Sequence, residues 1–206
     1  MKTLTKEMQD KISPSNAIEL LKEGNLRFVK NLKINRNLLQ QANETSDGQH
    51  PFAVVLSCID SRTSAELIFD QGLGDIFSVR IAGNIINEDI LGSMEFGCKA
   101  AGSKIILVLG HSGCGAVKGA CDNVEMGNLT ALLNKIQPAI KDETQTKDNR
   151  TSSNKEFVDN VTGINVKRAI AEIKERSPIL REMEAAGDIK IVGGVHDVGT
   201  GEVTFY

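Results

Sequence analysis

The chain has 206 residues, of which 40% are hydrophobic and 25% charged, and this length and composition suit one globular domain with one sizeable core. Its formal net charge is −3 and it has no basic stripe interleaved with aromatic residues, so nothing in the composition favours a nucleic-acid partner. Because no run approaches the ~18 apolar residues of a membrane span and the first residues lack the apolar run of a secretory signal, we expect a cytoplasmic protein that binds no membrane.

The N-terminal part, residues 1–45, is expected to form a helical arm. Residues 1–12 show no clear core pattern, but the Ser-Pro-Ser-Asn run at 13–16 is a helix-start signal, and apolar residues then recur at near-helical spacing to about residue 30. Residues 42–51 are polar and rich in residues that interrupt regular structure, so they predict a loop.

The rest of the chain, residues 46–206, is predicted to be an α/β core that completes a single domain. Short apolar runs alternate with helical patterns, which indicates a mostly parallel β-sheet flanked by helices, with four parallel strands and a C-terminal antiparallel strand. The predicted strands are residues 52–57, 75–80, 104–110, 189–195 and 203–206. The predicted helices are residues 63–70, 89–101, a segment from about 113, 128–140, 155–176 and a short helix from 177, with a charged linker at 142–154.

Two clusters of reactive residues follow two of the predicted strands. Cys58, Asp60 and Arg62 come directly after the first strand, and His111 and Cys114 come after the third. Functional groups collect at the carboxyl ends of the strands in open parallel sheets, and adjacent strands lie about 4.8 Å apart. Thiolates, imidazoles and carboxylates are the ligands that zinc takes. The two clusters therefore predict one shared zinc site, provided that their strands are neighbours.

Other candidate groups have plainer interpretations. Cys98 and Cys121 are expected to be buried as small hydrophobic residues, and the absence of a C-x-x-C pair disfavours a redox role for the thiols. His50 is interpreted as a solvated loop residue, with a proton-shuttle role as the alternative, and His196 is interpreted as structural. Asn84 is a candidate to brace the metal-binding loops.

Taken together, the motifs resemble those of the β-class carbonic anhydrases. The matching segments are residues 58–62, 72–75, 80–84 and 110–115. The resemblance implies that Cys58, His111 and Cys114 bind zinc and that Asp60 and Arg62 form a catalytic dyad. Asp60 then either takes the fourth zinc position or pairs with Arg62 and leaves that position to water.

The resemblance also implies a set of substrate-binding positions. Gln49 matches a glutamine that hydrogen-bonds the substrate, and Phe77 and Ala82 match positions that line the pocket. Ala82 is smaller than the valine expected there, and Gly113, in the turn beside Cys114, is assigned to the same site.

The implied function is zinc-dependent, reversible hydration of CO2 to bicarbonate and a proton. Zinc lowers the pKa of a bound water from about 15.7 to about 7, and the dyad gates and orients the hydroxide that attacks CO2. The resemblance further implies a homodimer or homotetramer, with the active sites near the interface and the N-terminal helix on the partner. Two alternatives stay open: hydrolysis of CS2 or COS, and a zinc-stabilised structural or sensory module, which the pair of Asp60 and Arg62 disfavours.

Overall fold

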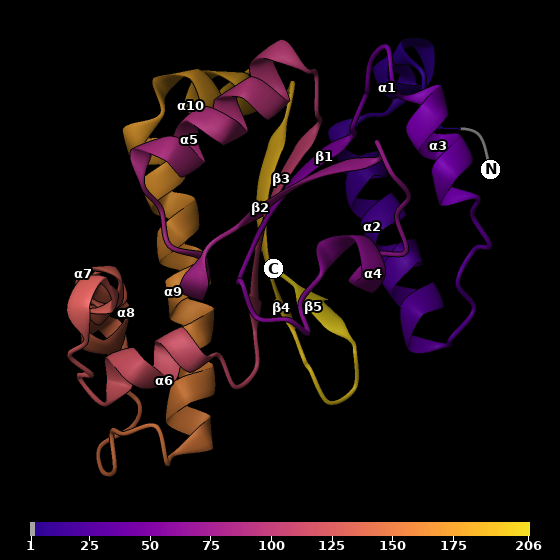
Figure 1. The fold of residues 1–206 in the computed structure, drawn as a ribbon. Coiled ribbons are helices and arrows are strands. Elements are labelled where there is room, and N and C mark those ends of the chain that lie inside the picture. Colours follow the sequence, from indigo (N-terminus) through magenta and orange to yellow (C-terminus); the bar gives the residue numbers. More distant parts are fainter. Residues whose placement is uncertain (1–2) are drawn as a thin grey trace.

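A computed structural model describes residues 3–206, and its centre is one five-stranded sheet (Figure 1). The strands are β1 (Ala53–Ser57), β2 (Ile76–Arg80), β3 (Ile105–His111), β4 (Lys190–His196) and β5 (Val203–Phe205). Their order across the sheet is β2-β1-β3-β4-β5; the first four strands are parallel and β5 is antiparallel to β4. The predicted α/β class, with four parallel strands and a C-terminal antiparallel strand, is confirmed.

Helices cover both faces of this sheet (Figure 1). They are α1 (Lys6–Lys11), α2 (Pro14–Val29), α3 (Leu38–Glu44), α4 (Ala65–Ile68), α5 (Glu88–Glu95), α6 (Gly115–Cys121), α7 (Gly127–Asn134), α8 (Gln137–Asp142), α9 (Lys155–Arg176) and α10 (Pro178–Ala185). A short 3-10 turn at Ala82–Asn84 and a π-helical turn at Phe96–Ala100 complete the described elements.

The alternation of side chains along each strand explains the two layers. Val54 and Leu56 of β1 point to the face covered by α5, α9 and α10, whereas Ala53 and Val55 point to the face covered by α2 and α4. Every residue of β1 and of β3 is buried. Because both strands are buried on both faces, they read in the sequence as continuous apolar runs.

Two predicted boundaries are wrong, each for a local reason. Residues 128–140 form two helices, because Pro138 has no N–H to donate within a continuous helix. The predicted loop 42–51 starts too early, since α3, which is capped by the side chain of Asn37, runs to Glu44. Within the expected arm, residues 1–12, the structure shows α1, with Gln9 buried; residues 1–2 lie outside the described chain.

The sheet order brings the two reactive clusters together. β1 and β3 are neighbours, and their register pairs Ser57 with Leu109, so Cys58 and His111 follow at the same edge of the sheet. Over residues 3–206, none of the helices combines the length and the apolar character needed to cross a membrane.

Candidate metal centre

Three residues from two neighbouring strand ends form a compact ligand set. Cys58 follows β1, His111 is the last residue of β3, and Cys114 precedes α6. Their ligand atoms all lie within 4.8 Å of one another, and the two sulfur atoms are 3.9 Å apart. A tetrahedral zinc ion with Zn–S bonds of about 2.3 Å needs two sulfurs about 3.8 Å apart. The spacing of the sulfurs therefore fits zinc.

The orientation of His111 fits the same ion. Its Nδ1 lies 3.0 Å from the carbonyl oxygen of Ser112, so Nδ1 carries the proton and donates it there. Its Nε2 is buried and has no hydrogen-bond partner among the described residues. An imidazole that donates through one nitrogen and leaves the other bare is the arrangement of a metal-bound histidine.

The electrostatics of the two thiols favour a charged ligand at Cys58. The hydrogen bond from Cys114, together with that from the amide of Gly83, lowers the pKa of Cys58 below its usual value. The bond with Cys58 and burial both raise the pKa of Cys114. In this pair the Cys58 thiolate accepts a hydrogen bond from the Cys114 thiol. A divalent cation bound by both sulfurs would allow both thiols to ionise.

Asp60 and Arg62 lie beside this set as a two-point ion pair. The Nε and Nη2 atoms of Arg62 donate to the two carboxylate oxygens of Asp60 over 3.0 and 2.9 Å, and the Arg62 amide donates over 2.9 Å. These bonds hold the pKa of Asp60 well below its usual range. Asp60 is therefore ionised and can only accept hydrogen bonds at neutral pH.

The backbone that carries Cys58 and Asp60 is held by two residues to which the sequence assigned no role. Arg80, at the end of β2, donates to the carbonyl oxygens of Cys58 and Asp60 over 3.0 and 2.6 Å. The hydroxyl of Thr63 donates to the same two oxygens over 3.1 and 3.0 Å. The only signal for Arg80 in the sequence is its place at the start of the matching segment 80–84.

A cavity of about 230 Å³ opens beside the ligand set, and its walls are mostly apolar. It is lined by Cys58, Ile59, Asp60, Ala82, Gly115, Ala116, Gly119, Leu129 and Leu133. Ala82 therefore lies where the sequence predicted it. Gly113 instead lines a separate cavity of about 440 Å³, together with residues of the β4–β5 turn.

The structure does not bring Gln49 and Phe77 to this cavity within one chain. Gln49 is exposed ahead of β1, and Phe77 pairs in register with Val54 near the start of β2, whereas Cys58 lies beyond the far end of β1. Phe77 packs edge-on against Phe96 with ring centroids 6.1 Å apart. Their substrate roles stay predictions that require a second chain.

The remaining candidates of the sequence lie mostly as expected. Cys98 and Cys121 are buried, and burial raises their pKa values to about 12 and about 11. His196 is 3% exposed and pairs in register with His111, and burial lowers its pKa. Asn84 is buried, but its amide nitrogen has no partner among the described residues, so the bracing comes from the Gly83 amide instead.

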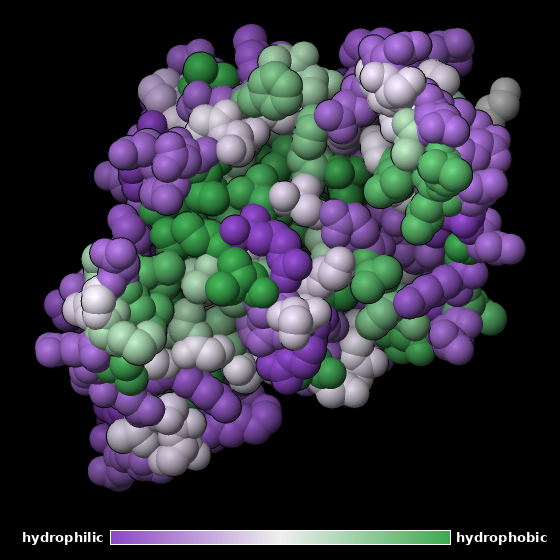
Figure 2. All heavy atoms as spheres, in the orientation of Figure 1, coloured by the Kyte–Doolittle hydropathy of each residue, from purple (hydrophilic) through white to green (hydrophobic). Residues whose placement is uncertain are grey.

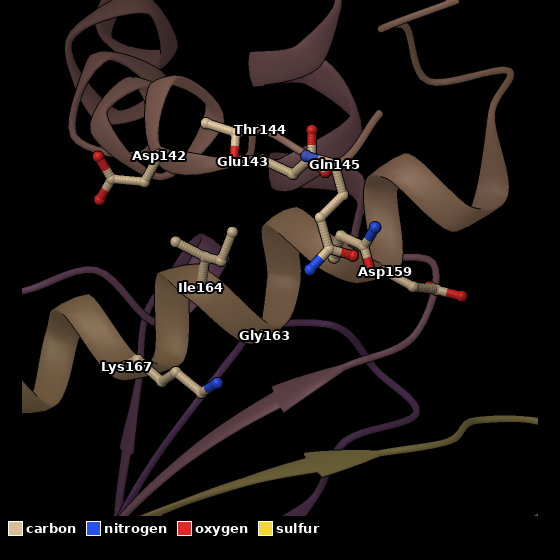
Figure 3. Close-up of a pocket in the computed structure, with 9 residues that line it drawn as sticks. Asp142, Glu143, Thr144, Gln145, Asp159, Gly163, Ile164 and Lys167 are labelled. Atoms are coloured by element: carbon tan, nitrogen blue, oxygen red, sulfur yellow. Dashed lines mark hydrogen bonds between the residues drawn. The ribbon is translucent and has the colours of Figure 1, made fainter. Parts of the chain in front are cut away.

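A polar cavity of about 250 Å³ lies elsewhere, beside α9 (Figure 3). Figure 3 shows Ile164 of α9 pointing towards the segment that carries Asp142. Asp142 pairs with Arg168, Glu143 with Arg150, and one oxygen of Asp159 with Lys155. The other oxygen of Asp159 is buried and has no partner among the described residues. This cavity therefore offers no free ligand set comparable to that of Cys58, His111 and Cys114.

Comparison with known proteins identifies the family. The family model described as carbonic anhydrase matches residues 53–203. The carbonic anhydrase of Mycolicibacterium smegmatis is 33% identical over 197 residues, which cover 93% of this chain and 92% of that protein. The β-carbonic anhydrase CafA of Aspergillus fumigatus superposes with a TM-score of 0.71 at 25% identity, covering 93% of this chain and 89% of that one. The chain belongs to the β-class carbonic anhydrases.

As a β-class carbonic anhydrase the protein is a lyase. A solved structure of tetrameric β-carbonic anhydrases from Sordaria macrospora has the same fold, with a TM-score of 0.69 at 24% identity, and covers 79% of this chain and 84% of that one. Within this β-class carbonic anhydrase, the residues that fit a zinc ion are the three that the sequence motifs indicated.

Proposed function

We propose that this β-class carbonic anhydrase catalyses the reversible hydration of CO2 at a zinc ion held by Cys58, His111 and Cys114. The observation that carries the proposal is the position of the Asp60–Arg62 pair beside a set of three ligands. A structural zinc site has four protein ligands, whereas a catalytic site keeps one position open. Because Arg62 grips both oxygens of Asp60, the carboxylate is withheld from the fourth position.

In this reaction the residues of the chain would hold the metal, orient the attacking water and keep the charged product away from the apolar cavity. When bound, zinc supplies a water that ionises near neutral pH. Asp60, ionised and lining the apolar cavity, would accept a hydrogen bond from such a water through a carboxylate oxygen and so orient it towards the cavity. CO2 is neutral and suits walls built from residues such as Leu129 and Leu133, while the charge of Asp60 repels the bicarbonate product from the same walls.

The decisive experiment is the Asp60→Ala variant. We expect CO2 hydration, measured by stopped flow, to fall by about 10² to 10⁴, as for the loss of a proton-handling or orienting group, while one zinc ion per chain remains. Asp47→Ala, at an exposed loop position, is the matched control and should keep wild-type activity. Full activity in Asp60→Ala would refute the assigned role, and no turnover by the wild-type protein between about pH 6 and 9 would favour a structural zinc module.

We also propose that the protein works as a homodimer or a homotetramer. β2 is an edge strand that carries the half-buried Phe77 and Val79, and Phe77 packs against the exposed Phe96. Figure 2 shows hydrophobic surface gathered in the middle of the face that Figure 1 presents. A second chain docked on this face would cover that surface and could bring its own Gln49 to the cavity. Light scattering at several concentrations tests the assembly.

A cytoplasmic location completes the proposal. None of the four cysteines, all of which lie within the described residues, forms a disulfide, which suits a reducing compartment. Fractionation of cells with an antibody against the protein tests it.

A further inference from the structure

The buried amide of Asn25, on α2, connects three separate parts of the chain. Its Nδ2 donates to the carbonyl oxygens of Ile68 and Gly201 over 3.2 and 2.9 Å. Its Oδ1 accepts from the amide of Val203 over 2.9 Å. Asn25 is 7% exposed, so these bonds are formed away from water, where an unpaired polar group costs most.

One of the connected parts leads to the dyad. Ile68 is the last residue of α4, and α4 follows directly on the turn that carries Asp60 and Arg62. Thr63 lies between this turn and α4, and its hydroxyl donates to the carbonyl oxygens of Cys58 and Asp60. The carboxyl end of α4 is thus joined by a short, hydrogen-bonded stretch to the first zinc-ligand loop.

The other connected part leads to the second ligand loop. Gly201 lies in the turn between β4 and β5, and Val203 is the first residue of β5. In the same turn, the amide of Val198 donates to Ser112 Oγ over 3.0 Å. The Ser112 amide donates to the carbonyl oxygen of His196, the last residue of β4, over 2.9 Å. Ser112 lies between the ligands His111 and Cys114, so the β4–β5 turn and the end of β4 each hold their loop at one point.

We propose that Asn25 is a positioning residue for the metal centre, which fixes the loop of Cys58 and Asp60 relative to the loop of His111 and Cys114. The proposal rests on the proposed zinc site. The two loops follow different strands. Asn25 bonds both to the end of α4, which continues from the first loop, and to the β4–β5 hairpin, which contacts the second. A change at Asn25 therefore alters the angle and spacing at which the ligands meet, although Asn25 itself touches neither.

The sharpest variant is Asn25→Asp, which keeps the shape and the acceptor for Val203. It removes both donated bonds and places a carboxylate oxygen against the carbonyl oxygens of Ile68 and Gly201. The second attachment of α2, from Arg27 to Asp70 over 2.6 Å, remains. We expect the rate of zinc release to a chelator to rise by about 10- to 100-fold, the range for residues that support metal ligands. The visible spectrum of the cobalt-substituted protein should also change.

Asn43→Asp, at an exposed position of α3, introduces the same charge and serves as the matched control, with zinc release within about twofold of wild type. Ser112→Ala removes the other end of the connection. If the β4–β5 turn carries the effect, the double variant releases zinc more slowly than the product of the two single effects predicts.

A wild-type rate of zinc release in Asn25→Asp, or effects of Asn25→Asp and Ser112→Ala that simply multiply, would overturn the proposal. Should circular dichroism show that Asn25→Asp does not fold, Asn25→Ser replaces it, because the shorter side chain cannot donate to either carbonyl oxygen and adds no charge. It is judged by the same rate of zinc release and the same coupling with Ser112→Ala. Because zinc release is measured without turnover, a lack of CO2 hydration by the wild-type protein would refute the proposed function and leave this test intact.

Discussion

Replacing Gly83 by alanine should destabilise the protein and loosen Cys58 at the same time. Gly83 has a φ of +65°, in the left-handed region, and its amide donates to the Cys58 sulfur over 3.4 Å. A Cβ at this position would lie 2.7 Å from Ile136 Cδ1 and 3.2 Å from Ala116 Cβ. The residue is therefore constrained both by its backbone and by its neighbours.

The magnitude follows from these two constraints. A left-handed conformation costs an L-residue roughly 1–2 kcal/mol, and overpacking a core typically costs about 1–3 kcal/mol. We expect Gly83→Ala to lower the free energy of unfolding by about 2–5 kcal/mol. Since domains of this kind are stable by about 5–15 kcal/mol, the variant should still fold.

Urea denaturation followed by circular dichroism, at fixed zinc and protein concentrations, measures the loss. Ile136→Val removes the Cδ1 atom that the new methyl group would meet, so it separates the two contributions. Alone it should cost about 0.5–1.5 kcal/mol; combined with Gly83→Ala it should cost about 1–2 kcal/mol less than the sum. A loss below about 0.5 kcal/mol, or strict additivity of the pair, would refute the reasoning.

Two further predictions follow from buried groups outside the metal centre. Burial alone raises the pKa of Asp70, but the hydrogen bonds from Arg27 and Arg36 outweigh it and lower the pKa below its usual value. The stability that this carboxylate adds is thus present above the unfolded pKa of about 3.9 and is lost as pH falls through the lower folded pKa. Asp70→Asn should lower the free energy of unfolding by about 3–5 kcal/mol at pH 7. It should also weaken the fall of the urea midpoint as the pH is lowered into the acid range. A fall as steep as that of the wild-type protein would contradict this. Secondly, Cys98, with its pKa near 12, should react with a disulfide reagent at pH 8 only when the chain unfolds, so rapid labelling of native protein at Cys98, located by mass spectrometry, would be a contrary result.

Much of the fold could be predicted because its signals are local. The strands β1 and β3 are continuous apolar runs, and α9 is predicted at its observed limits, residues 155–176. The errors lie where a single residue competes with a longer pattern. Pro138 divides one apolar, helical stretch into two helices, and α3, which starts at the cap Asn37, extends to Glu44 inside the segment predicted as a loop.

The candidate site was predictable to a different degree. The proximity of Cys58, His111 and Cys114 could be predicted because these residues directly follow recognisable strands. The supporting residues could not be predicted, since Arg80 and Asn25 act through backbone carbonyls that lie 20 or more positions away in the sequence. Hydrogen bonds to the backbone leave no pattern of residue types, so only the packed structure reveals them.

The order of the strands also determines when the ligand set can assemble during folding. Cys58 and His111 are separated by more than fifty residues, and they meet only after β1 has paired with β3, with β2 displaced to the edge of the sheet. Closing so long a loop is an entropic cost that the pairing of β1 with β3 helps to offset. The ligand set is therefore complete only once this part of the sheet has formed, and zinc bound at the proposed site would favour the paired state over the open chain.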